Sequence, residues 1–177
     1  MRTSHLVVLF GLTLFGSGCG KEASDSAKIV ATRPGVTETT IPADDKIVAG
    51  QLVYVPAYSH VLTADAANPL NLATTLFVRN ADPTRSIIVT RVEYFDSGGK
   101  SLGSRLKSPL KLAPLASVDF FVRESDESGG ASPSFLVDWV ATEAVAVPVV
   151  ESIMISTTGS QGISFSCPGR VIQGRQP

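Results

Sequence analysis

Residues 135–140 read Phe-Leu-Val-Asp-Trp-Val, and this short stretch indicates the fold class. Successive side chains of a β-strand point to opposite faces, so Phe135, Val137 and Trp139 would share one apolar face. The stretch is rich in β-branched and aromatic residues, which is typical of strands. The stretch therefore predicts a strand with one side packed on a core.

Five further runs with a period of two lie around this stretch. They cover residues 70–78, 88–94, 118–123, 152–156 and 163–167. In the second run the alternation predicts one shared face, made of Ile88, Thr90, Val92 and Tyr94. No window of the chain holds a helical period over three turns, so we expect an all-β protein.

Turn-forming residues separate these runs. Asn80-Ala81-Asp82-Pro83 combines local side-chain acceptors with a proline, and residues 96–100 carry the Gly-Gly pair of a tight hairpin. Pro56 lacks a backbone N–H, so we expect residues 52–58 to form an edge strand. Seven to eight antiparallel strands with one buried face predict an immunoglobulin-like antiparallel β-sandwich.

The composition limits the function classes. The chain has 177 residues, 44% of them hydrophobic, and a formal net charge of −1, which suits one domain and argues against a nucleic-acid-binding protein. Two cysteines and two histidines leave few residues for a catalytic or metal constellation. We therefore expect no catalytic residue, no metal and no cofactor.

The N-terminus predicts export. Residues 1–5 include one arginine, residues 6–15 are mostly apolar, and residues 16–18 are small. This pattern is typical of a signal peptide, and the apolar run is too short to span a bilayer. We therefore assign residues 1–18 to a signal peptide.

Cys19 sets the expected membrane attachment. Ser17-Gly18-Cys19 resembles a bacterial lipoprotein box, although Gly16 stands where a branched apolar residue is usual. Acylated Cys19 would anchor the protein by its N-terminal lipid, and Gly20 after it favours the outer membrane, on its periplasmic side, in a Gram-negative cell. The alternative is ordinary cleavage, which would leave a secreted or soluble periplasmic protein.

The segment after Cys19 predicts a tether. Polar residues and prolines dominate up to about residue 46, and such a composition buries too little apolar area to fold. We expect residues 19–49 to carry the lipid and a disordered tether. The sandwich would follow over residues 50–174, with a tail at 175–177.

Tyr54, Tyr58 and His60 form the candidate binding surface. Tyr54 and Tyr58 are four residues apart on the expected edge strand, so they would share a face. A partner strand could add to such an edge through backbone hydrogen bonds. Packing of the tyrosines over the core is the alternative, and a strand-end histidine bonded to backbone is the alternative for His60.

Two further features have plain structural interpretations beside functional ones. Residues 124–130 could offer oxygen ligands to Ca²⁺, yet they lack EF-hand spacing and suit a solvated turn. Cys167 shares an apolar alternation with Ile163 and Phe165, which predicts a buried thiol. The alternative for Cys167 is a disulfide between two copies of the chain.

Seven short segments carry a resemblance to a known family. They are Val53–His60, Val78–Pro83, Val92–Lys100, Leu112–Ser117, Glu124–Gly130, Gln161–Phe165 and Gly169–Ile172. Together they resemble a bacterial family of exported lipoproteins known as domain of unknown function 3124, over about Gly50 to Ile172. The resemblance implies no activity, substrate or catalytic residue, and Cys167-Pro168 departs from its pattern.

These observations favour a cell-envelope lipoprotein that acts as a non-enzymatic binding or accessory module for an unknown protein or envelope ligand. A hydrolase or metal-binding protein that uses His60 is one alternative. A structural spacer of the envelope is another. Fold class alone does not choose among them, because sandwiches host unrelated functions.

Overall fold

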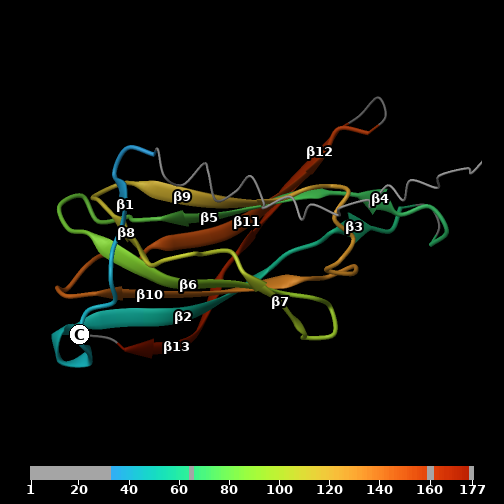
Figure 1. The fold of residues 1–177 in the computed structure, drawn as a ribbon. Coiled ribbons are helices and arrows are strands. Elements are labelled where there is room, and N and C mark those ends of the chain that lie inside the picture. The colour runs from blue at the N-terminus through green and yellow to red at the C-terminus, as the bar shows by residue number, and fades with distance from the viewer. Residues whose placement is uncertain (1–32, 64–65, 159–161, 176–177) are drawn as a thin grey trace, which may run out of the picture.

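The computed structural model describes residues 33–63, 66–158 and 162–175. Two antiparallel sheets stack face to face, with a small third sheet at one end (Figure 1). The all-β sandwich predicted from the alternation is confirmed, whereas an immunoglobulin-like strand order stays a prediction. Among the described residues, no helix is long and apolar enough to cross a membrane.

The larger sheet has seven strands. In spatial order they are β1 (Val36–Glu38), β8 (Leu110–Leu112), β6 (Ile87–Phe95), β10 (Ser134–Ala141), β2 (Ala49–Pro56) and β13 (Arg170–Arg175), with β7 (Ser101–Ser104) also paired to β6. A short 3-10 helix, η1 (Asp44–Lys46), lies between β1 and β2. The strand that indicated the fold class, β10, is therefore central in this sheet.

The smaller sheets complete the domain. The four-stranded sheet runs β12 (Ile163–Pro168), β11 (Val149–Ser156), β5 (Ala73–Arg79) and β9 (Ser117–Val122), and a separate pair joins β3 (His60–Val61) to β4 (Leu70–Asn71). Gly169 links β12 to β13, so one stretch of chain forms an outer strand of both large sheets. A Cβ at Gly169 would come within 2.7 Å of the Val53 side chain, so this corner requires glycine.

The core lies between the two large sheets, where the predicted alternation of β9 and β10 is confirmed. Phe120, Phe135 and Trp139 are all buried. The face of β11 that turns inward is the one with Ser152, Met154 and Ser156, while Ile155 is exposed. The Ser152 hydroxyl is satisfied because it donates a hydrogen bond to the Pro56 carbonyl oxygen at 2.5 Å.

The shared face predicted for β6 is wrong over half of the strand. Ile87 and Val89 are buried there in place of Ile88 and Thr90. The register against β10 shifts between Asp138 and Trp139, which leaves Thr90 as an extra residue of a β-bulge. A bulge inverts the alternation after it, so the period of two fails at this point.

The expected edge strand and the expected start of the domain also need correction. β2 pairs with β10 on one side and with β13 on the other, so Pro56 ends an internal strand. Its missing N–H is harmless because β13 pairs only as far as Tyr54. β1 pairs with β8, so residues from Arg33 onward are folded, and the expected tether residues 33–49 belong to the domain. The strand β1 is so short that the composition of this segment does not reveal it.

Candidate functional site

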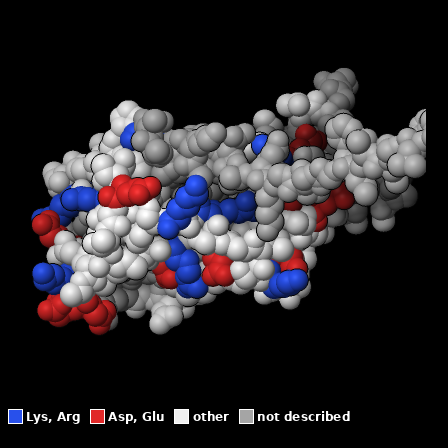
Figure 2. Space-filling model, viewed as in Figure 1, with Lys and Arg blue, Asp and Glu red and all other residues white. Residues whose placement is uncertain are grey.

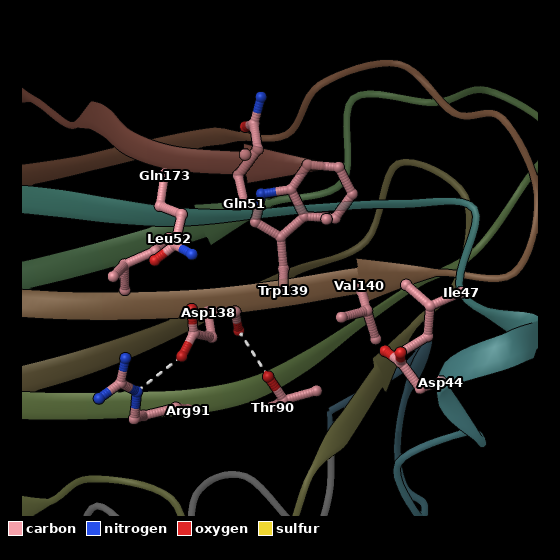
Figure 3. A pocket seen from close by; sticks show the side chains of 12 residues that line it. Asp44, Ile47, Gln51, Leu52, Thr90, Arg91, Asp138, Trp139, Val140 and Gln173 are labelled. Carbon is pink, nitrogen blue, oxygen red and sulfur yellow. Dashed lines mark hydrogen bonds and ion pairs between the residues drawn. The ribbon is translucent and has the colours of Figure 1, made fainter. Parts of the chain in front are cut away.

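A groove crosses the outer face of the seven-stranded sheet. It has a volume of about 610 Å³ and passes over β6, β10, β2 and β13. It is lined by Asp44, Ile47, Gly50, Gln51, Leu52, Thr90, Arg91, Asp138, Trp139, Val140, Gln173 and Gly174. The segment around η1 closes one end, where Ile47 and Asp44 face Val140 (Figure 3).

Gly50 leaves the hollow part of this groove open. A Cβ there would come within 2.9 Å of the Trp139 carbonyl oxygen and 3.3 Å of the Val140 side chain. Gly50 pairs with Val140 across the sheet, so its missing side chain exposes that part of the floor. The walls at this end are the apolar side chains of Ile47 and Val140 together with the Asp44 carboxylate, while Leu52 lies further along, opposite Asp138 (Figure 3).

The other end of the floor is charged. Arg91 Nε donates to Asp138 Oδ2 at 2.7 Å, and Arg91 Nη1 lies 3.5 Å from Glu93 Oε2. The bulge at Thr90 positions this pair, because it sets Arg91 directly opposite Asp138, and the Thr90 hydroxyl donates to the Asp138 carbonyl oxygen at 3.3 Å. Figure 3 shows both contacts between neighbouring strands.

The charges around the floor are predominantly negative. Asp44 and Asp138 line the groove and Glu93 contacts its only arginine, Arg91. Carboxylates thus outnumber guanidinium groups among the residues that line or adjoin the groove, and Lys46 of η1 lies two residues after Asp44. A ligand that carries a cationic group and an aliphatic part matches this arrangement.

On the inward face of the same two strands, opposite the groove, lie an unpaired donor and an unpaired acceptor (Figure 3). Trp139 Nε1 and Gln51 Oε1 are buried without a hydrogen-bond partner among the described residues. The two residues are direct neighbours across β10 and β2. Unpaired buried polar atoms cost stability, so this register position carries an energetic cost.

The structure separates the three residues of the predicted binding surface. Tyr54 is 38% exposed and lies on β2, two residues from the groove residue Leu52 and on the same face. The Tyr58 ring lies 6.0 Å from the Phe165 ring, and His60 pairs with Asn71 in the β3–β4 sheet. Only Tyr54 therefore adjoins the groove.

The remaining sequence candidates have ordinary surroundings. Cys167 is half-buried on β12 rather than buried, and desolvation raises the pKa of its thiol. Asp126 accepts hydrogen bonds from the backbone and hydroxyl of Ser128, as expected for a turn. In the described ranges, no group of three or more His, Cys, Asp or Glu side chains could hold a metal ion. Cys19 lies outside the described residues.

Sequence reasoning missed the groove itself. Asp138 was visible as the polar member of an alternating strand, but its pairing with Arg91, 47 residues away, depends on the bulge at Thr90. Gly50 had one usable signal, because a glycine inside a strand pattern marks a close approach or an open site.

Comparison with known proteins places most of the domain in one family model. Residues 50–172 match the model described as a protein of unknown function, DUF3124. No curated protein matches the chain. A crystal structure titled Thermotoga maritima 1070 is similar with a TM-score of 0.40 and 9% identity, over 68% of this chain and 92% of that one.

Proposed function

Since this chain belongs to the DUF3124 family, whose description assigns no activity, we propose its function from the groove: the protein is a binding module for an extended, basic polypeptide segment. The observation that carries the proposal is the combination of an apolar hollow at Gly50 with the half-exposed carboxylates of Glu93 and Asp138 beside it. A lysine or arginine side chain could pair with these carboxylates while an aliphatic neighbour fills the hollow.

The adjoining sheet edge supports a polypeptide ligand. Gln173 and Gly174 of β13 line the groove, and β13 is the terminal strand of the seven-stranded sheet. An extended segment could form backbone hydrogen bonds with such a strand while its side chains reach the groove. Tyr54 lies on the same face of the sheet as the groove and would contact the bound segment where it leaves the groove.

The place of action in this proposal is the cell envelope. The signal peptide and the lipoprotein-like Ser17-Gly18-Cys19 support a chain exported and anchored through acylated Cys19. Gly20 favours the periplasmic side of the outer membrane in a Gram-negative cell. Labelled palmitate should comigrate with the wild-type protein and not with Cys19→Ser; equal labelling of both would refute the anchor.

Two short fluorescent peptides test the ligand class. One alternates lysine with valine and the other glutamate with valine, and anisotropy measures their binding to the purified chain. We expect the lysine peptide to bind more tightly, and Asp138→Asn to weaken it about three- to tenfold.

The matched control is Asp119→Asn. Asp119 is an ion-paired aspartate of similar exposure on the outer face of the other sheet, where it accepts hydrogen bonds from Arg33. The control should bind the lysine peptide as the wild type does. Equal binding of both peptides, or equal loss in both variants, would refute the groove as a site for basic segments.

A further inference from the structure

One end of the sandwich has two loops held by a single residue. Asp82 follows β5, and its carbonyl oxygen accepts a hydrogen bond from the Leu115 N–H at 3.1 Å. Its carboxylate Oδ2 accepts one from the Ala146 N–H at 2.9 Å. The loop before β9 and the loop before β11 are thus fixed relative to each other.

Each of these loops presents an apolar side chain to solvent. Leu115 is 68% exposed, Val147 is 55% exposed and Val149, at the start of β11, is 47% exposed. Val149 and Ser117 both pair with Arg79 of β5, so the two loops leave the sheet two strands apart, about 10 Å. We call Leu115, Val147 and Val149 the apolar tip.

Leu115 is held there against local preference. Its φ of 58° makes it the one non-glycine residue with positive φ in the described ranges. Leucine disfavours this conformation, which glycine or asparagine adopts readily, and its exposed side chain gains little from packing. A strained and exposed leucine is better explained by a role of that side chain than by the fold.

The chain enters the domain at the same end. Gly35 accepts a hydrogen bond from the Ala113 N–H in the loop that carries Leu115, and Arg33 bonds to Asp119 near the start of β9. Only 14 peptide steps separate Arg33 from Cys19, a reach of at most about 50 Å. β3 and β4 lie at the far end of the sandwich, which is much further from this entry point (Figure 1).

We propose that the apolar tip docks on the surface of a phospholipid bilayer, with Leu115 and Val147 inserted at the level of the headgroups. The inference rests on the membrane anchor proposed for Cys19, which would keep this end of the domain within about 50 Å of the lipid. Charged side chains of both signs lie at this end on the face that Figure 2 shows, and the ion pair of Arg85 with Glu143 adds to this polar rim. Small apolar groups within a polar rim suit an interfacial contact.

Tryptophan reporters test the docking. Leu115→Trp and Val147→Trp would be compared with Leu62→Trp, a matched control, because Leu62 is 61% exposed and follows β3 at the far end. Each lipidated chain is placed in vesicles of phosphatidylethanolamine and phosphatidylglycerol with or without brominated acyl chains. The buried Trp139 of the parent chain supplies the background signal.

Brominated lipid should quench most of the added fluorescence at positions 115 and 147 and leave position 62 unchanged. Equal quenching at all three positions would overturn the proposal, as would unquenched tryptophans at the tip. A tip that is unquenched because a second copy of the chain covers it would show self-association in sedimentation velocity, and this result also overturns the proposal.

A glycine variant separates a role in docking from a role in folding. Leu115→Gly removes the backbone strain, so its thermal midpoint should equal or exceed that of the wild type. In a Val147→Trp chain the same change should reduce quenching by brominated lipid. Unchanged quenching would show that Leu115 makes no lipid contact.

A second form of the chain keeps the docking test independent of acylation. A hexahistidine tag before residue 19, bound to nickel-chelating lipid, holds the same point of the chain at the bilayer. If palmitate labelling fails while the tip reporters on tagged chains are quenched, the anchor is refuted and the docking stands. If labelling succeeds while the tip stays unquenched, the docking alone is refuted.

Discussion

Two polar clusters of this molecule differ in how completely they are satisfied. Asn80 and Asp82 are buried, and backbone groups from three separate loops complete their hydrogen bonds. Arg91 and Asp138 form one half-exposed ion pair on the floor of an open groove. The first cluster therefore stabilises the fold, whereas the second keeps charge available at the surface.

The Asn80 side chain shows why the first cluster is structural. Its Nδ2 donates to the carbonyl oxygens of Arg85, Leu112 and Ala113 at 2.7, 3.3 and 2.9 Å. Its Oδ1 accepts from the Asp82 N–H at 3.0 Å. One amide thus joins the turn after β5 to the loop after β8.

The largest expected effect is on Asn80. Asn80→Ala leaves buried carbonyl and N–H groups without partners, so the free energy of unfolding should fall by about 2–4 kcal/mol. Chemical denaturation measures this change. A loss as small as that of a surface residue would contradict the structural role of the cluster.

The second largest effect should be a loss of the stability that the same cluster contributes when the solution is made acidic. Hydrogen bonds from the N–H groups of Ala146 and Thr84 lower the pKa of Asp82 from 3.8 to about 2. A depressed pKa contributes stability that is complete above about pH 4 and is lost as the pH falls towards 2. The stability advantage of wild type over Asp82→Asn should therefore shrink across that window, as followed by denaturation at each pH. A constant difference would show that the carboxylate charge does not matter.

Replacing Gly50 should have a smaller effect on stability. It tests the groove in the comparison of the two clusters. Gly50→Ala pushes a methyl group against the Trp139 carbonyl oxygen, so it should cost about 1–2 kcal/mol and narrow the hollow. Gly174→Ala is the control, because its nearest neighbour would lie at 3.5 Å, an ordinary contact. Equal stability of the two variants would mean that the sheet relaxes around Gly50.

The parts that the sequence predicted are those set by local rules. Alternation identified the inward faces of β9 and β10, and turn residues located the Asn80–Pro83 turn and the hairpin at residues 96–100. These features need only side-chain period and turn chemistry.

The parts it did not predict depend on distant segments. Whether β2 is an edge depends on β13, which follows more than 110 residues later and covers it. The Arg91–Asp138 pair depends on a bulge that no local pattern marks. The groove depends on the position of the η1 segment, whose Asp44 and Ile47 line one end of it. Of the expected binding residues only Tyr54 adjoins the groove, because the chain leaves the seven-stranded sheet before Tyr58.

The smallest expected effect closes the comparison, because it measures the ion pair itself. Arg91 and Asp138 keep 39% and 31% of their side-chain surfaces exposed, so water screens their attraction. A double-mutant cycle of Arg91→Ala and Asp138→Ala should give a coupling energy of about 0.5 kcal/mol, far below the cost of removing Asn80. Denaturation in low and high salt measures it, and the coupling should shrink in high salt. A coupling above about 2 kcal/mol would make the pair a structural element like the Asn80–Asp82 cluster, and the groove would then lose its distinctive charge.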